Sequence, residues 1–239
     1  MRAFGTFMLA LLAGAAGLGA TPVRIMPLGD SLTAQGEARQ FLKEKLTAAG
    51  FSFEFVGSQG GPELRHEGHS GYTIGPDTSK PGSLADNIAT WIPDAKPDVI
   101  LLLIGNNDYN TKAGSLPETA PERLATLLER ICDLAPHATV IVSTVLKIAA
   151  VEDYAGALNR TIPETVAKLR AAGRQVEFAD LHNEVDLIKG SQPNNGPDSD
   201  FVDGTHLNSK GARKLADGWF SHLKPVLEAR AGITATAAE

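Results

Sequence analysis

Short apolar runs alternate with longer amphipathic segments along most of the chain. The run at Asp98–Ile104 is continuously apolar after its first residue, which is typical of a strand buried on both faces of a parallel sheet. Phe51–Val56 alternates in part between apolar and polar residues and is closed by Gly57, as expected for another strand. Together the apolar runs predict five strands, at Val23–Leu28, Phe51–Val56, Asp98–Ile104, Thr139–Thr144 and Gln175–Ala179.

The segments between these strands have the composition and periodicity of helices. In Pro121–Leu134, leucine and isoleucine recur at the i, i+3, i+4 and i+7 spacing of one helical face. Helices are expected at Glu37–Ala49 closed by Gly50, at Leu84–Trp91 ended by Pro93, at Pro121–Leu134, at Tyr154–Ala172, and from about Ser209, with Leu215, Trp219 and Leu223 on one face. Alternating strands and helices form right-handed βαβ units around a parallel sheet. The pattern predicts an α/β fold: a three-layer α/β/α sandwich with a five-stranded parallel sheet, flavodoxin-like in type.

The first 20 residues differ from the rest of the chain. Arg2 precedes an apolar, glycine- and alanine-rich run from Phe4 to Leu18, and Gly19-Ala20 supplies the small residues of a cleavage site. A membrane anchor is the competing interpretation, but this run is shorter than the ~20 residues that a span requires. We expect residues 1–20 to be a signal peptide, residues 21–230 one folded domain and residues 231–239 a flexible tail. The mature protein is then secreted or periplasmic, without stable membrane association.

The net charge limits the classes of partner that the protein can bind, and the cysteine content limits its disulfides. The net charge is −6 at pH 7 and becomes more negative without Arg2, whereas nucleic acids and anionic lipids demand basic surfaces. A nucleic-acid partner is therefore not expected. Cys132 is the only cysteine, so no intramolecular disulfide can form, and its expected role is that of a small apolar residue on a helix.

Candidate chemistry begins where the first strand ends, at Gly29-Asp30-Ser31. A serine at such a strand-to-helix junction lies at the carboxyl edge of the sheet, where open α/β sheets bind their ligands. Its hydroxyl becomes a nucleophile only when a base accepts its proton and nearby donors stabilise the resulting oxyanion. The remaining loops at that edge should therefore contain a base and donors.

Three of those loops contain suitable residues. Asp203 and His206 are three residues apart before the last helix, so the carboxylate can orient the imidazole toward Ser31. Asn107 follows a buried strand, and Gly71 can bring its backbone N–H close to a ligand because it has no Cβ. Each has a simpler interpretation: a solvated aspartate, a helix-entry histidine, a turn asparagine and a flexible glycine.

The order of these motifs resembles the four blocks of the SGNH hydrolases, also known as GDSL-type esterases. The matching elements are Gly29-Asp-Ser-Leu32, the loop glycine Gly71, Gly-x-Asn-Asp at Gly105–Asp108 and Asp-x-x-His at Asp203–His206. The resemblance implies Ser31 as nucleophile, His206 as base and Asp203 as its orienting acid. It also implies an oxyanion hole made by the backbone N–H groups of Ser31 and Gly71 and the side chain of Asn107. Asp30 and Asp108 would then make structural hydrogen bonds.

A narrower similarity is to carbohydrate esterase family 3, whose members deacetylate xylan. It rests on Ile25-Met-Pro-Leu-Gly-Asp-Ser31 and on His66-Glu-Gly-His-Ser-Gly-Tyr-Thr-Ile74, with Asn106 where that family often has threonine. The resemblance implies a serine esterase that removes acetyl groups from a polysaccharide such as xylan, or from a small ester, without a cofactor or metal. His69 and Tyr72 are candidate sugar-facing groups; for Trp91, core packing is at least as good an interpretation.

Other functions are weighed against this hypothesis. His66-Glu67-Gly68-His69 differs from the helical His-Glu-x-x-His zinc motif in spacing, and the chain lacks the Gly-x-Gly-x-x-Gly turn of nucleotide-binding folds. A structural calcium bound by Asp198, Asp200 and Asp203 stays open. A lysophospholipase or thioesterase, and a carbohydrate-binding protein without activity, also remain alternatives.

Overall fold

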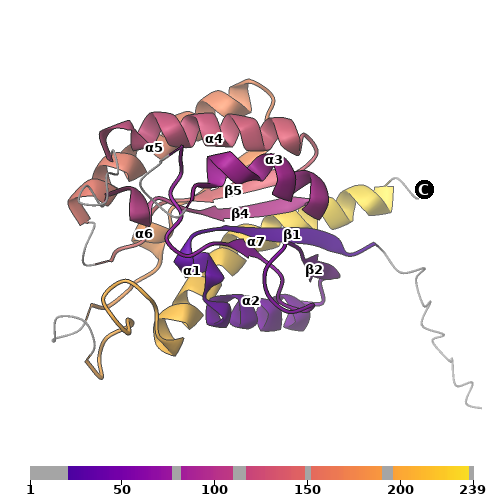
Figure 1. Ribbon diagram of the computed structural model, residues 1–239. Helices are drawn as coiled ribbons and strands as arrows, with labels where there is room; N and C mark the ends of the chain where they lie inside the picture. The colour runs from indigo at the N-terminus through magenta and orange to yellow at the C-terminus, as the bar shows by residue number, and fades with distance from the viewer. Residues whose placement is uncertain (1–20, 77–81, 110–116, 149–151, 190–195, 237–239) are drawn as a thin grey trace, which may run out of the picture.

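Five parallel strands run through the centre of the molecule in the order β2-β1-β4-β5-β6 (Figure 1). The computed structural model describes residues 21–76, 82–109, 117–148, 152–189 and 196–236. The strands are β1 Val23–Gly29, β2 Phe53–Phe55, β4 Val99–Leu103, β5 Thr139–Ser143 and β6 Val176–Ala179. They confirm the predicted parallel sheet. A sixth strand, β3 Glu67–Gly68, was expected to be loop; it pairs with β1 at Leu28 and Gly29, beyond the end of β2.

Helices cover both faces of the sheet and produce the predicted three layers. Helices α3, α4 and α5 pack side by side on one face, whereas α2 and α7 pack together on the other (Figure 1). The helices are α1 Ser31–Ala34, α2 Gly36–Ala48, α3 Leu84–Ala95, α4 Ala120–Leu134, α5 Glu152–Ala171, α6 Leu181–Glu184 and α7 Ser209–Thr236, with short 3₁₀ turns at Asn106–Tyr109 and Pro117–Thr119. The short helices after β1, β4 and β6 were not predicted.

The strand order predicts a crevice beside Ser31. From β1 the chain crosses to β2 on one side and later to β4 on the other, so the connections that follow β1 and β4 diverge. In open parallel sheets this divergence creates the binding crevice at the carboxyl ends of the strands. Ser31 follows β1 and Asn107 follows β4, so both flank this point.

Helix α3 extends beyond its predicted end. It was expected to stop before Pro93, yet it continues to Ala95 and ends at Lys96 in the left-handed conformation. Proline removes only the hydrogen bond to the carbonyl of Ala89, and both residues are exposed on the outer face, where water can satisfy that carbonyl. Burial of Ile92 and Ala95 favours the additional turn.

A signal peptide was expected at the start of the chain and a flexible tail at its end. The proposed signal peptide, residues 1–20, lies outside the described residues. Helix α7 continues to Thr236, so helical backbone occupies most of the segment expected to be a tail; residues 237–239 are not described. In the described ranges, none of the helices combines the length and apolar character needed to cross a membrane.

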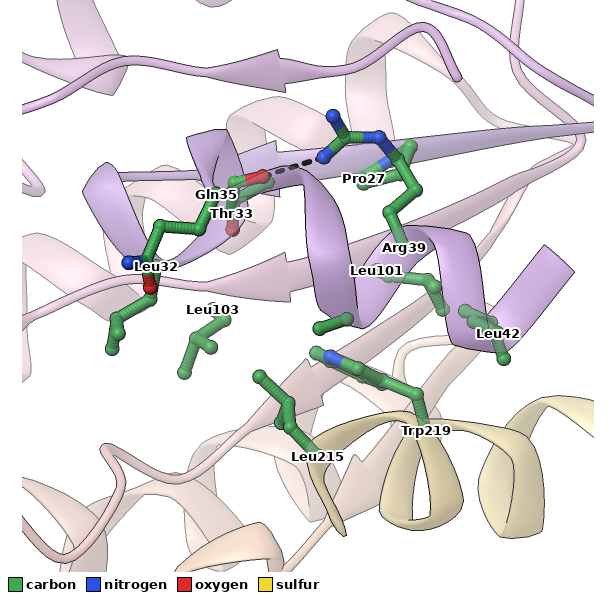
Figure 2. Close-up of a pocket in the computed structure, with 11 residues that line it drawn as sticks. Pro27, Leu32, Thr33, Gln35, Arg39, Leu42, Leu101, Leu103, Leu215 and Trp219 are labelled. Carbon is green, nitrogen blue, oxygen red and sulfur yellow. Dashed lines mark hydrogen bonds between the residues drawn. The ribbon is translucent and has the colours of Figure 1, made fainter. Parts of the chain in front are cut away.

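A buried arginine, Arg39 of α2, lies at the edge of a small apolar cavity. Leu215 and Trp219 of α7 line a cavity of about 30 Å³ together with leucines of β4 (Figure 2). At its edge Arg39 donates from one terminal nitrogen to Thr33 O at 2.7 Å and from Nε to Leu64 O at 2.9 Å. Burial lowers the pKa of Arg39 to about 10, so it remains charged at neutral pH. Arg39 thus ties the turn after Ser31 to the segment that leads into β3.

Candidate active site

Ser31 is the first residue of α1, two residues after the end of β1. Asp30 caps this helix, because its Oδ1 accepts the Leu32 N–H at 3.0 Å. As the first residue of the helix, Ser31 has no acceptor for its own N–H within the helix. Asp30 is completely buried, and burial raises its pKa to about 6 although the bonds from Leu32 and Asn106 favour the carboxylate.

Gly29 is required by the close approach of β1 and β4. A Cβ at this position would lie 2.1 Å from Leu103 O and 2.4 Å from Thr33 Oγ1. Because one of these atoms belongs to the backbone of a buried strand, it has little freedom to move. Packing therefore determines the glycine of the Gly-Asp-Ser motif and with it the path of the chain into Ser31.

The loop that bears Asp203 and His206 is closed by backbone pairing. Phe201 and Leu207 form an antiparallel bridge, and Val202 N donates to His206 O at 2.9 Å. Inside this loop Asp203 Oδ1 accepts the backbone N–H of Thr205 at 3.0 Å and of His206 at 2.7 Å. The Asp203 carboxylate therefore orders its own loop in addition to contacting the imidazole.

Asp203, His206 and Ser31 form one continuous chain of hydrogen bonds. His206 Nδ1 lies 2.7 Å from Asp203 Oδ2, and His206 Nε2 lies 2.9 Å from Ser31 Oγ. The small burial of Asp203 opposes ionisation, but its hydrogen bonds from His206 and Thr205 outweigh that effect and lower its pKa. An ionised Asp203 makes Nδ1 the donor and leaves Nε2 able to accept the Ser31 proton. The arrangement predicted from the Asp-x-x-His spacing is thus present.

Two residues that support this loop were not recognised as such from the sequence. Asp200 is buried; it accepts the Ile188 N–H at 2.7 Å and pairs with Lys214 of α7 at 2.8 Å. Asn208 accepts from Lys210 N and Gly211 N at the start of α7 and donates to Ser199 O. Asparagine directly before a helix is a recognisable cap, so Asn208 could have been identified. The partner of Asp200 could not, because it is 14 residues away.

Gly71 occupies a tight turn beside the Ser31 junction. Tyr72 N donates to His69 O at 3.2 Å, which closes the turn, and Gly71 has a φ of +81°, a conformation that favours glycine. The turn begins next to β1, because His69 N donates to Gly29 O at 3.0 Å. The backbone N–H of Gly71 has no hydrogen-bond partner within the ranges described above.

Asn107 is connected to the same turn. Its Nδ2 donates to Tyr72 O at 2.9 Å, so the amide is oriented by the residue that follows Gly71. The neighbouring Asn106 donates to Asp30 Oδ2 at 3.2 Å, a contact that the sequence did not indicate. Asp108 accepts the Ile74 N–H at 3.1 Å and pairs with Arg123 at 2.5 Å. Asp30 and Asp108 thus make the structural hydrogen bonds expected of them.

His69 and Tyr72, the candidate sugar-facing groups, pack with Trp91 of α3. The ring centroids of His69 and Trp91 are 4.2 Å apart with planes within 5°, and those of His69 and Tyr72 are 4.8 Å apart. His69 Nε2 is 2.6 Å from Glu67 Oε1, and only 16% of the His69 side chain is exposed. His69 is therefore mostly committed to contacts within the protein.

The residues of the two metal-site alternatives are engaged in contacts within the protein. His66 Nδ1 accepts the Gly68 N–H at 3.0 Å, and burial, with a contribution from Arg39, lowers the His66 pKa to about 4. Asp200 and Asp203 are paired with Lys214 and His206, respectively. In the part of the chain that the structure describes, no three His, Cys, Asp or Glu side chains gather as a metal site requires.

Comparison with known proteins identifies the family. The chain matches the GDSL-like Lipase/Acylhydrolase family over residues 28–214. It is similar to the family 3 carbohydrate esterase of Clostridium thermocellum, with 32% identity, a TM-score of 0.71 and coverage of 88% of this chain and 100% of that one. A family 3 carbohydrate esterase from Talaromyces cellulolyticus is 26% identical, with a TM-score of 0.69 and coverage of 87% and 99%.

A longer relative extends the comparison. The multidomain esterase of Ruminococcus flavefaciens is 28% identical over an alignment of 242 positions, gaps included, which covers 88% of this chain but 29% of that protein. The chain spans less than two thirds of the length of the curated relatives that it matches. The family match itself extends from the end of β1 into α7 and confirms the resemblance found in the sequence. The chain therefore belongs to the GDSL-like lipase/acylhydrolase family of carboxylic ester hydrolases.

Proposed function

We propose that the protein is a serine esterase that removes acetyl or other short acyl groups from carbohydrate, with acetylated xylan or a related polysaccharide as substrate. The observation that carries the proposal is the hydrogen-bonded chain of Asp203, His206 and Ser31, with contacts of 2.7 Å and 2.9 Å. These contacts match the donor and acceptor roles that acyl transfer through a serine requires.

Acylation of Ser31 is the first step. Ser31 Oγ attacks the acetyl carbonyl carbon while its proton moves to His206 Nε2, and ionised Asp203 stabilises the imidazolium. The tetrahedral oxyanion accepts hydrogen bonds from the backbone N–H groups of Ser31 and Gly71 and from the side chain of Asn107. His206 then protonates the departing sugar oxygen, and the C–O bond of the ester breaks. Loss of one oxyanion donor is expected to lower kcat roughly 10²- to 10³-fold.

Deacylation uses the same residues in reverse. A water molecule gives a proton to His206 Nε2 and attacks the acetyl-serine, and the oxyanion forms against the same donors. The tetrahedral intermediate collapses, acetate leaves, and His206 returns the proton to Ser31 Oγ. Neither step needs a metal or an organic cofactor.

The exposure of the site supports an acyl group carried on a polymer. Within the described residues, the side chains of Asp203 and His206 are 54% and 32% exposed, so the histidine can be reached from solvent. The apolar cavity beside Leu32 has a volume of about 30 Å³ (Figure 2). That is well below the volume of the pockets that hold small ligands. A separate hollow of about 170 Å³ between Leu32 and Leu207 would have to receive a longer acyl chain.

Export is part of the proposal. The basic and then apolar character of residues 1–20 supports a signal peptide, with the enzyme secreted or periplasmic after cleavage. Polymeric xylan does not enter cells, so an enzyme that acts on it has to meet it outside the cytoplasm. N-terminal sequencing of the protein recovered outside the cytoplasm is expected to begin near residue 21; recovery with Met1 intact in the cytoplasm would contradict this part.

Replacement of the nucleophile tests the proposed chemistry. Ser31→Ala is expected to lower kcat on an acetyl ester by about 10⁴-fold or more while the thermal unfolding midpoint stays within the range of the parent. Ser209→Ala, at the start of α7, removes a surface hydroxyl bonded to Glu37 and serves as the matched control with full activity. Substantial turnover by Ser31→Ala would refute the assignment and point to another nucleophile, whereas a parent protein without turnover on any acetyl ester would leave the non-enzymatic carbohydrate-binding alternative.

A substrate series tests the specificity. Acetate release is expected to be fastest from acetylated xylan or another acetylated glycan, and to fall as the acyl chain is lengthened in a matched series of synthetic esters. A preference for long acyl chains would favour the lysophospholipase or thioesterase alternative while leaving the role of Ser31 unchanged.

A further inference from the structure

We propose that Glu67 and His69 are positioning residues for the oxyanion hole: they form a buried pair that holds the turn presenting the Gly71 N–H. This inference rests on the proposed function, because it assumes that Gly71 donates to the oxyanion. Neither residue needs to contact the substrate.

The Gly71 turn is attached at its start to the end of β1, which leads into Ser31, and at its end to Asn107, in the 3₁₀ turn after β4. At its start, His69 N donates to Gly29 O at 3.0 Å, two residues before Ser31. At its end, Tyr72 O accepts from Asn107 Nδ2 at 2.9 Å. Any rotation of this turn therefore changes the direction of the Gly71 N–H and disturbs the amide of Asn107. Between these attachments the turn is closed by the bond from Tyr72 N to His69 O at 3.2 Å.

The His69 ring supplies a further restraint on the turn. It is stacked on Trp91 at 4.2 Å and lies 4.8 Å from Tyr72, so side chains at the first and last positions of the turn belong to one aromatic cluster. Trp91 belongs to α3, which packs on the face of the sheet. The ring cluster thus connects the Gly71 turn to a rigid element that contributes none of the proposed donors.

Glu67 determines how the His69 ring is held. Its side chain is 1% exposed and accepts from Ser58 N and Ser58 Oγ, each at 2.7 Å, and from His69 Nε2 at 2.6 Å. Burial opposes ionisation, but the hydrogen bonds from His69 and Ser58 outweigh it and lower the pKa of Glu67. An ionised carboxylate can only accept hydrogen bonds, so His69 Nε2 must carry a proton. The ring then has one orientation in which this bond is made.

Packing alone does not explain why a carboxylate is buried at this position. Burial destabilises a carboxylate unless its oxygens are fully paired, and an apolar residue would pack there without that penalty. Glu67 is in β3, the two-residue strand registered against Leu28 and Gly29. The Glu67 carboxylate therefore holds the His69 ring at a fixed position relative to the end of β1. His69 in turn holds Gly71.

Two variants test this role. His69→Phe retains an aromatic ring against Trp91 but removes the bond to Glu67, and Glu67→Gln keeps the side-chain shape while removing the ionised acceptor. Each is expected to lower kcat on an acetyl ester by about 10- to 100-fold with KM unchanged, because the donor is displaced rather than lost. The double variant is expected to lose no more than His69→Phe alone, because both act through one contact.

A readout of the oxyanion hole separates positioning from general damage. Methylboronic acid forms a tetrahedral adduct with a reactive serine, and its affinity for both single variants is expected to weaken by the same factor as kcat. Glu184→Gln is the matched control, because Glu184 also pairs with a histidine, His222, but on the surface. It is expected to change neither kcat nor boronate affinity.

Other outcomes would overturn the proposal. If both variants kept the kcat and boronate affinity of the parent, the pair would not position Gly71. If KM rose with kcat unchanged, His69 would be a substrate contact. If the double variant lost the product of the two single effects, the residues would act separately. Ser31→Ala is measured alongside these variants and is expected to be inactive whichever of these results is found. An active Ser31→Ala would mean instead that the proposed function itself has failed.

Discussion

The two halves of the candidate site are built by different physical means. The Ser31 junction lies against the core: Asp30 is completely buried, and β4 approaches so closely that only glycine fits at position 29. The Asp203–His206 loop lies at the surface, with its two side chains 54% and 32% exposed, and hydrogen bonds order it. Packing therefore fixes the position of Ser31, whereas polar contacts fix the position of His206.

This difference predicts opposite consequences of substitution. A change at the buried junction should affect the free energy of unfolding, because it disturbs a densely packed strand contact. A change in the exposed loop should affect turnover, because few core contacts depend on it. The following variants test that separation, starting with the largest effect.

Asp203→Asn should have the largest effect, and it should affect activity alone. The amide oxygen of the new side chain can still accept the backbone N–H of Thr205 and His206, so the loop keeps its shape. The new NH₂ group, facing His206 Nδ1, forces the imidazole proton onto Nε2 and leaves Ser31 without an acceptor. Steady-state kinetics are expected to show a kcat about 10³- to 10⁴-fold lower.

The matched control is Asp217→Asn. Asp217 is 55% exposed, close to the exposure of Asp203, and pairs with Lys45. This variant is expected to retain full activity, and both variants should unfold within about 1 kcal/mol of the parent. An Asp203→Asn enzyme with undiminished kcat would show that the carboxylate does not orient His206.

Gly29→Ala should have the next largest effect, and it should affect stability first. The new methyl group would lie 2.1 Å from Leu103 O, so β1 or β4 has to shift. Urea unfolding is expected to give a loss of about 3 kcal/mol or more. Gly61→Ala is the control, because a Cβ at Gly61 meets no atom within 4 Å. Equal stability of the two variants would mean that packing does not determine the path into Ser31.

Asp30→Asn should remove a dependence of stability on pH. The pKa of Asp30 is raised from 3.8 to about 6, so the folded state holds its proton more tightly than the unfolded state. Stability from this group is complete below pH 3.8 and is lost as the pH rises through about 6. The loss amounts to about 3 kcal/mol at roughly 1.4 kcal/mol per pKa unit.

The Asp30→Asn variant should therefore lack this decline. Asn106 Oδ1 has no hydrogen-bond partner in the described ranges, so rotation of the Asn106 amide would let it accept from the new amide at position 30. Urea unfolding of both proteins between pH 4 and pH 7 is expected to show a difference that grows with pH in favour of the variant. Parallel curves for parent and variant would contradict the burial cost assigned to Asp30.

The sequence predicted the fold well where local pattern determines structure. The continuous apolar run at Asp98–Ile104 became the buried strand β4, and the helical periodicity of Pro121–Leu134 became α4 within one residue. The order of short motifs also placed Ser31, Asp203 and His206 in one hydrogen-bonded chain. Such features depend on residues near one another in the chain or on one strand-loop-helix unit.

Contacts between distant segments could not be predicted in the same way. Strand β3 is two residues long and exists because β1 extends past β2, which no local pattern reveals. Helix α3 continues through Pro93 because the carbonyl of Ala89, which Pro93 cannot bond, is exposed to solvent. Exposure depends on the tertiary structure and cannot be read from the local sequence. The stacking of His69 on Trp91 joins residues 22 positions apart, so the sequence did not indicate this internal contact.

Covalent labelling of Ser31 tests the central claim most directly. A p-nitrophenyl alkylphosphonate reacts with an activated serine and leaves a stable tetrahedral adduct in the oxyanion hole. Peptide mass spectrometry is expected to find one phosphonyl group per chain, on the peptide that contains Ser31, with esterase activity lost in proportion to labelling. Full labelling of Ser31 with activity retained, inactivation with the label elsewhere, or no reaction by a fully active enzyme would contradict the account.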